Sequence, residues 1–132
     1  MFKQLPRQTF RDVQEVLFPA YFQLNTLCIS LLAVLAPLAA AVTTQQWQLL
    51  GVSMAATLAN LLYFEPRTSA VMQKRAAMER MSSSEVLAVD AAGKEAAMKA
   101  LGSSFGALHG ASSAFNLAAF VSCIVYGWSR ML

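Results

Sequence analysis

The first thing the sequence lacks is charge along most of its first half. No Asp, Glu, Lys, Arg or His occurs from Val16 to Phe64, and only the polar turn Thr43-Thr44-Gln45-Gln46 interrupts this apolar stretch. A charge at the centre of a membrane helix costs about 2.5 to 3.5 kcal/mol on insertion scales. A third apolar run extends from Phe105 to Trp128, and about 20 residues suffice to cross a hydrocarbon core of about 30 Å. The sequence therefore predicts a protein that lies in lipid.

Charge is scarce in the chain as a whole. Charged residues make up 13% of the 132 residues and hydrophobic residues 57%, whereas soluble domains carry about 25% charged residues. The length suits one domain, residues 1-132. The net charge of +3 is modest, and the basic residues flank the apolar runs, where they orient a protein in a membrane. We therefore expect the lipid bilayer as a partner and no nucleic acid.

The chain also has few groups that could carry chemistry. It has one histidine and two cysteines, and Cys28 and Cys123 both fall in apolar runs, so a disulfide framework is not expected. It has no G-x-S-x-G elbow, no phosphate-binding glycine loop, no carboxylate cluster and no zinc-ligand spacing. These absences predict that the protein is not an enzyme and holds no catalytic or structural metal.

The pattern of apolar residues predicts an all-α membrane protein. We expect three transmembrane helices, about 17-42, 48-65 and 103-128, with short interfacial helices between the second and the third. Pro19 suits the first turn of the first span, Pro37 should kink or end it, and Pro66 should kink the second span or end it. Ser82-Ser83-Ser84-Glu85 is typical of a capping box at the start of a short helix. Asp12 and Glu15 argue against a signal peptide, so the first run should be retained as a helix.

The basic residues predict the orientation. Nine of the ten lie on one side of a three-span arrangement and only Arg130 lies on the other, which puts the N-terminus and the 65-101 segment on the positive side. The C-terminus is then across the membrane.

Polar side chains recur at helical spacing on each predicted span and should turn away from lipid. On the first span they are Gln23, Thr26 and Ser30; on the second, Ser53, Thr57 and Asn60; on the third, His109, Ser112, Ser113 and Asn116. Three such faces on three helices predict one shared polar interior. The residues that we expect there, including the charges at the end of the second span, are Asn60, Glu65, Arg67, His109, Ser112, Ser113 and Asn116.

Small residues recur at every fourth position of the third span. They are Gly102, Gly106, Gly110, Ala114, Ala118 and Ser122, which we call the small-residue ridge. Such a ridge lets a second helix approach closely. It is the most specific packing signal in the chain and predicts a helix-packing or partner interface.

Three blocks of sequence resemble the transmembrane protein 205 family. They are LPRQTF with LFPAYF (Leu5 to Phe22), LLYFEPRTSAVM (Leu61 to Met72) and FGALHGASSAFNL (Phe105 to Leu117), and together they cover most of the chain. The resemblance implies a small all-helical membrane protein, usually of four spans, with no established catalytic activity. Its marked positions fall here on Pro19, Glu65, Pro66, Arg67, Thr68, His109, Gly110, Ser112, Ser113 and Asn116.

The chain departs from that family in lacking the hydrophobic helix that precedes the L-P-R-x-T-F block. Either the chain has three helices natively or its N-terminal part is not included. Three helices leave a polar groove that a fourth would normally cover, so a partner helix could fill it.

His109 and the Glu65-Arg67 pair each admit more than one interpretation. A neutral His109 could join helices by a hydrogen bond to Asn60, to a serine or to a carbonyl. Alternatively it could ligate the metal of a haem or chlorophyll, because Gly106 and Gly110 leave room for a flat ring. Glu65 and Arg67 could pair with each other or with Arg11 and Glu15, or Glu65, Asn60 and His109 could form an ion or proton path.

The leading hypothesis from sequence is a non-catalytic accessory or scaffold subunit, packed by the small-residue ridge into a larger membrane complex. One alternative is a small-molecule or ion transporter or trafficking factor that acts as an oligomer. A second is a pigment- or haem-binding subunit that uses His109. For the location we expect an organellar membrane, either the thylakoid or the mitochondrial inner membrane.

Overall fold

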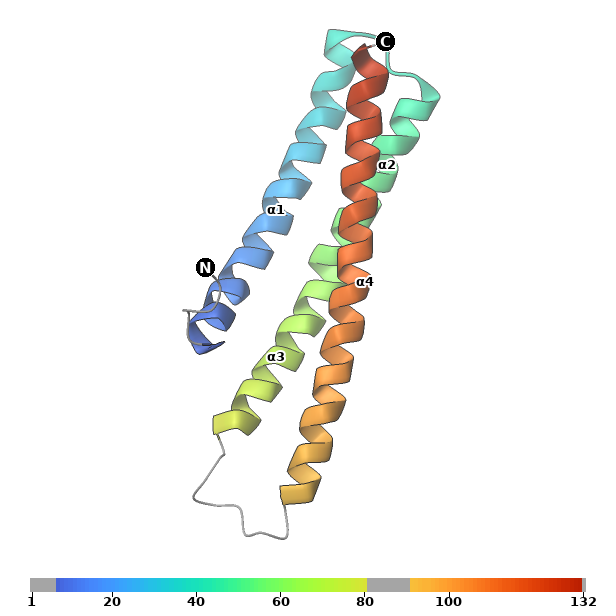
Figure 1. Ribbon diagram of the computed structural model, residues 1–132. Coiled ribbons are helices and arrows are strands. Elements are labelled where there is room, and N and C mark those ends of the chain that lie inside the picture. Colours follow the sequence, from blue (N-terminus) through green and yellow to red (C-terminus); the bar gives the residue numbers. More distant parts are fainter. Residues whose placement is uncertain (1–6, 81–90, 132) are drawn as a thin grey trace.

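The structure is a computed structural model that describes residues 7–80 and 91–131, and every regular element within these residues is helical (Figure 1). The elements in chain order are α1 (Arg7–Ala39), α2 (Thr44–Ala59), η2 (Asn60–Phe64), α3 (Glu65–Arg80) and α4 (Ala91–Met131). η2 is a five-residue π-helix that joins α2 to α3 without a break.

Three helical stretches are long and apolar enough to cross a membrane: Asp12–Ala39, Thr44–Arg80 and Ala92–Met131. Many large hydrophobic side chains on them are exposed, among them Leu24, Val34, Leu62 and Phe120. Such surfaces suit lipid. The predicted all-α membrane protein with three spans is confirmed.

The first helix begins earlier than the sequence indicated. α1 starts at Arg7 and not near residue 17, and it ends at Ala39. Pro19 consequently lies inside the helix, where it removes one backbone hydrogen bond without ending α1. Pro37 acts as expected, because the helix ends two residues after it.

The second span does not end near residue 65 but continues through Pro66. At η2 the backbone N–H of Glu65 donates to the carbonyl of Asn60, one residue further back than in an α-helix. A proline ring crowds the carbonyl four residues earlier, and the wider π turn just before Pro66 occurs where that crowding must be relieved. α2, η2 and α3 therefore form one continuous rod.

The short helices expected between the second and third spans take a different form. Residues 65–80 extend the second helix, and the segment from Ala91 is the first part of α4. The predicted capping box at 82–85 lies outside the described residues. Helical propensity continues along these polar segments, so nothing ends the helix where the hydrophobicity ends.

The turn between α1 and α2 is closed by a capping box. The backbone N–H of Gln46 donates to Thr43 Oγ1 at 3.3 Å, and Gln46 Oε1 accepts from the backbone N–H of Thr43 at 3.1 Å. Gln46 Nε2 also donates to the carbonyl and hydroxyl of Ser129 on α4, at 3.1 and 3.2 Å. One side chain thus stabilises the start of α2 and holds the end of α4 against it.

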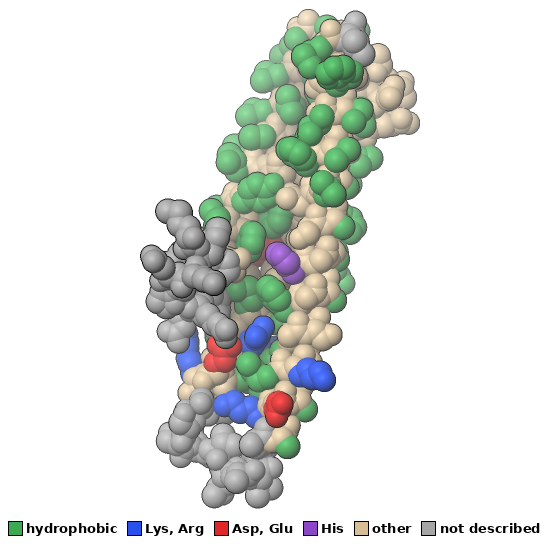
Figure 2. Space-filling model, viewed as in Figure 1, with side chains coloured by type: hydrophobic (Ala, Val, Ile, Leu, Met, Phe, Trp, Pro, Cys, Tyr) green, Lys and Arg blue, Asp and Glu red, His purple; other side chains and the backbone are tan. Residues whose placement is uncertain are grey.

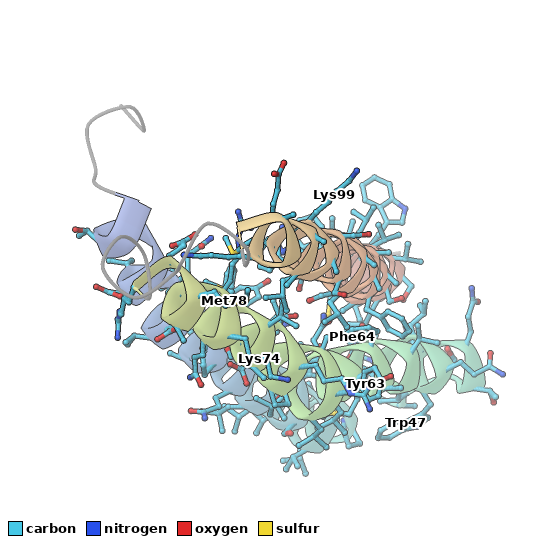
Figure 3. All side chains as sticks on the ribbon, turned by 90° about the horizontal axis from the view of Figure 1, so that it is seen from below. Trp47, Tyr63, Phe64, Lys74, Met78 and Lys99 are labelled. Carbon is cyan, nitrogen blue, oxygen red and sulfur yellow. The ribbon has the colours of Figure 1, made fainter. Side chains whose placement is uncertain are left out.

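The rod formed by α2, η2 and α3 lies between the other two helices. α4 packs along α2 and α3, and α1 packs mainly on α2, but no Cα of α1 lies within 8 Å of a Cα of α4 in the described residues. Viewed from below (Figure 3), Phe64 lies between η2 and α4, where its ring centroid is 5.2 Å from that of Phe115. α1 and α4 are therefore joined by side chains alone.

The two ends of the bundle differ, and we name them here. The closed end holds the 40–43 turn and the last residues of α4, with a small core of Ala36, Leu50 and Tyr126. The open end holds the first turns of α1 and α4 and the last turn of α3, and there α1 diverges from the other helices (Figure 1). Lysine and arginine side chains gather toward the open end (Figure 2), as expected for three crossings.

Candidate functional site: a polar groove between α1, α3 and α4

A groove of about 90 Å³ lies where α1 diverges from α4, and all three helices line it. α1 contributes Gln14, Glu15, Phe18, Tyr21 and Phe22. α3 contributes Glu65, Thr68, Ser69 and Met72. α4 contributes His109, Ser112, Ser113 and Asn116. The groove is therefore polar on two walls and largely aromatic on the third.

Two side-chain contacts bridge the groove between α1 and α4. The hydroxyl of Tyr21 donates to Asn116 Oδ1 at 3.1 Å. The rings of Phe18 and His109 lie 6.5 Å apart, tilted by 55°. Because the two backbones are too far apart to pack directly, these bridges span the opening of the groove between α1 and α4.

His109 lies at this opening, and Figure 2 shows the histidine in the hollow between α1 and α4. Its ring stacks on Phe105 with centroids 5.6 Å apart and planes 5° from parallel. No hydrogen bond joins it to Asn60, to a serine or to a carbonyl within the described residues, so the predicted polar link is not made. Stacking on Phe105, one turn earlier on the same helix, takes its place.

Of the pairings that the sequence left open, that of Glu65 with Arg67 does not occur, and a pairing that involves the Arg11 side chain lies outside the described residues. Glu65 Oε1 accepts a hydrogen bond from Ser69 Oγ at 2.9 Å. The Arg67 guanidinium lies over the ring of Tyr63, 4.2 Å from its centroid. Residues two apart on a helix point to different sides, so Glu65 turns into the groove and Arg67 turns away from it.

The structure brings five of the seven predicted interior residues to the groove. They are Glu65, His109, Ser112, Ser113 and Asn116. Asn60 and Arg67 are not among the lining residues. Asn60 is fully buried, and neither its Nδ2 nor its Oδ1 has a hydrogen-bond partner among the described residues.

The polar face of the second span is buried as predicted, but it packs away from the groove. Ser53 and Thr57 have no exposed surface. The Ser53 hydroxyl donates to the carbonyl of Ala119 at 3.0 Å, and Asn25 Nδ2 donates to Thr57 Oγ1 at 3.4 Å. These contacts hold α2 to α4 and to α1.

The polar face predicted on the first span is only partly buried and makes no hydrogen bond to another helix among the described residues. Gln23 is exposed. Thr26 and Ser30 direct their hydroxyls to the carbonyls four residues earlier, each at 2.8 Å. Hydroxyls that bond within their own helix need no partner from another.

The α1 wall of the groove was missed from the sequence. Its residues Gln14, Phe18 and Tyr21 are spaced i, i+4 and i+7, which places them on one helical face. The expectation that the first span began near residue 17 hid this pattern. Thr68 and Ser69, one turn after Glu65, were missed as interior residues because the second span was expected to end there.

The small-residue ridge faces outward along most of its length. A Cβ at Gly102, Gly106 or Gly110 would meet nothing within 4 Å beyond the helix's own backbone. Gly106, Gly110, Ala114 and Ala118 are exposed, and only Ser122 is buried. Steps of four residues turn about 400° around a helix, so the ridge winds out of the inner face of α4.

The described residues contain no group of three or more His, Cys, Asp or Glu side chains that could hold a metal ion. Gly106 and Gly110 leave open space on α4 beside His109. The pigment or haem alternative through His109 stays a prediction.

The fold and the groove define a class of protein: a multi-pass, all-α integral membrane protein. Residues 1–77, more than half of the chain, match the family described as a domain of unknown function (DUF4149), and the chain belongs to that family. The match includes α1, α2, η2 and the part of α3 that lines the groove, whereas α4 lies beyond it. No solved structure matches the chain. The resemblance to the transmembrane protein 205 family stays a prediction.

Proposed function

We propose that the protein is a non-catalytic accessory or scaffold subunit that packs the outer face of α4 against a transmembrane helix of another chain. The observation that carries this proposal is the exposed small-residue ridge, centred on Gly106, Gly110 and Ala114, with open space beside each glycine. Within residues 7–80 and 91–131, no other helix fills the space beside these glycines.

Lipid physics supports a partner at this face. Apolar helices gain little by leaving lipid, so they associate where small residues allow the backbones to approach closely. Within the apolar window of α4 only 6% of the residues are buried inside the chain, compared with 28% for the second span. α4 therefore offers a large face for another helix.

The test is a bulky substitution on the ridge with a matched control. Gly110→Leu fills the closest point of approach, whereas Gly51→Leu makes the same change at another exposed glycine with open space beside it. We expect that, in mild detergent, Gly110→Leu releases the chain from its complex and that Gly51→Leu leaves the complex intact. A chain that migrates alone before any substitution, or that is released equally by both, contradicts the proposal.

A photo-crosslinking residue at Ala114 identifies the neighbour. The proposal expects one discrete adduct with a chain of different mass, formed in native membranes before detergent is added. An adduct of twice the mass of this chain instead supports the second candidate, which acts as an oligomer. Adducts with lipid alone contradict both.

The second candidate is a small-molecule or ion transporter or trafficking factor, and the groove is the observation that favours it. Transport requires the groove to meet water from both sides of the membrane. The measurement is labelling of Ser112→Cys and Ser113→Cys by a membrane-impermeant thiol reagent, in a chain whose Cys28 and Cys123 are replaced by alanine. Labelling from both sides is expected of a transporter, and labelling from neither contradicts it.

Two finer expectations also stay predictions. Absorbance of the purified protein in the visible range, lost on His109→Ala, tests the pigment or haem alternative. Fractionation of thylakoid and mitochondrial inner membranes tests the organellar location.

A further inference from the structure

The groove has an unbalanced set of charges. Two carboxyl groups line it, those of Glu15 and Glu65, and no lysine or arginine is among the lining residues that the structure describes. Both glutamates are partly buried. Neither forms an ion pair with a side chain that the structure describes. The described cations nearest in sequence to Glu65 lie elsewhere, since Arg67 covers Tyr63 on the outside of η2.

A carboxylate that is partly shielded from water is costly unless a cation or several hydrogen bonds stabilise it. Glu65 accepts one hydrogen bond, from Ser69. The hydroxyl of Thr68, beside it in the groove, is a buried oxygen with no hydrogen-bond partner in the described part of the chain. This part of the groove thus holds a carboxylate with one hydrogen bond and a buried hydroxyl with none among the described residues.

The opposite wall is aromatic. Phe18, Tyr21 and Phe22 of α1 line the groove, and the Tyr21 and Phe22 rings meet edge to face, 5.2 Å apart. Ring faces attract cations, most strongly where water is scarce. Glu15 lies on this same wall and Glu65 on α3, so the groove combines carboxyl groups with aromatic rings, which suits a positively charged ligand.

The groove is also open between α1 and α4. In the described residues no Cα of α1 lies within 8 Å of a Cα of α4, and at the groove the Tyr21–Asn116 and Phe18–His109 contacts connect the two helices. A ligand can therefore place a polar head among the acceptors while an apolar chain extends between the helices into the bilayer.

We propose that this groove binds a primary ammonium group carried on an apolar chain. An ammonium ion supplies three hydrogen-bond donors and one positive charge, which match the carboxylates of Glu15 and Glu65 and the hydroxyl of Thr68. Phe18 and Phe22 cover its apolar side. The ligand is either the head of an aminophospholipid or a free long-chain amine, since both carry this chemistry. The site is separate from the outer face of α4 and does not depend on docking there.

The test is titration of the full chain in maltoside micelles, which contain no ammonium, with adducts detected by native mass spectrometry. The probes are dodecylamine and 1-dodecanol, which share one chain and differ in the head. The double variant Glu15→Gln/Glu65→Gln removes both carboxylates. Glu95→Gln is the matched control, because it makes the same change at an exposed position on α4 outside the groove.

We expect dodecylamine to bind at a concentration about tenfold or more below that of dodecanol. The double variant should remove this preference, and Glu95→Gln should leave it unchanged. Thr68→Val, a change of similar shape, should weaken dodecylamine binding by about threefold or more even if the double variant fails to fold. Equal binding of amine and alcohol, no adduct with either, or equal loss in Glu95→Gln overturns the proposal.

A second arm separates the two sources of the ammonium group. Phosphatidylethanolamine and phosphatidylglycerol with identical acyl chains are compared in the same way. Retention of the ethanolamine lipid alone, lost in the double variant, assigns the groove to an aminophospholipid. Binding of dodecylamine without retention of either lipid assigns it to a free amine. Retention of both lipids to the same extent overturns recognition of the ammonium group.

Discussion

The two ends of the bundle are built in opposite ways. At the closed end, Gln46 donates twice to Ser129, and the Arg130 guanidinium donates to the carbonyls of Ala41 and Ala36 at 3.1 and 3.2 Å. These contacts join all three spans. At the open end the helices diverge, and α1 meets α4 only through aromatic and polar side chains.

The closed end therefore contributes most to the stability of the bundle, whereas the open end contains the candidate binding site. Hydrogen-bonded, closely packed helices hold the closed end together, while at the open end Glu65 has one hydrogen bond, from Ser69, and the Thr68 hydroxyl has none in the described part of the chain. Binding sites commonly retain groups that do not favour the folded chain by themselves. Substitutions at the closed end should therefore lower stability more than substitutions in the groove.

The largest effect is expected at the contact between α2 and α4. Ser53 has no exposed surface, and its hydroxyl donates to Ala119. Ser53→Leu should lower the free energy of unfolding by about 3 kcal/mol, because the larger side chain forces the helices apart. Ser53→Ala, which removes only the hydroxyl, should cost about 0.6 kcal/mol. Unfolding in mixed micelles measures both, and equal effects would contradict close packing here.

The next largest effect is expected at Arg130, which donates from α4 to the carbonyl of Ala36 in the last turn of α1 and to that of Ala41 in the turn that follows. Arg130→Leu should lower the free energy of unfolding by about 1 to 2 kcal/mol, because it removes two charge-assisted hydrogen bonds and the cation at a helix C-terminus. Arg130→Lys keeps the charge but loses the planar guanidinium that reaches both carbonyls. It should lower the free energy of unfolding by about half as much. If the leucine variant unfolds like the unsubstituted chain, Arg130 does not stabilise the closed end.

Replacement of Asn60 should raise the free energy of unfolding instead of lowering it. Its amide is fully buried, with neither polar atom hydrogen-bonded in the described part of the chain. Asn60→Leu should raise the free energy of unfolding by about 1 kcal/mol, because an unpaired buried polar group is replaced by an apolar one. Thr57→Val is the control, since Thr57 accepts from Asn25 and its loss should not stabilise. A clear loss in Asn60→Leu would show that the amide has a binding partner.

The smallest effect is expected in the groove. Tyr21→Phe removes the hydrogen bond to Asn116 and keeps the ring. The free energy of unfolding should fall by about 0.6 kcal/mol, the average for a hydrogen bond between membrane helices. A loss greater than that of Arg130→Leu would reverse the comparison of the two ends, because it would make the groove the main support of the bundle.

The sequence predicted the parts of this structure that depend on local periodicity. The absence of charge from Val16 to Phe64 predicted two spans, and three are found. Spacing alone predicted that Ser53, Thr57 and Asn60 are buried together, and that His109 and Asn116 share one face of α4.

The predictions that were wrong concerned how far helices extend and which way their faces turn. The π turn at η2 carries the second helix past Pro66, and α1 begins at Arg7. In both places the helix includes polar residues that the composition had placed outside it. Of the alternatives for Glu65 and Arg67, a pair with each other is not formed, since residues two apart do not face each other on a helix.

The sequence by itself determined that the helices lie in lipid, how many spans there are and which helix faces are polar. It could do so because hydrophobic length and helical period are local properties. Only the tertiary structure decided that α4 lies against α2, that α1 stands apart from α4, and that most of the small-residue ridge faces outward from the bundle. Those outcomes depend on contacts such as Ser53 with Ala119, 66 residues apart. No local pattern specifies which of several possible helix pairs forms such a contact, because that choice rests on how the whole bundle packs.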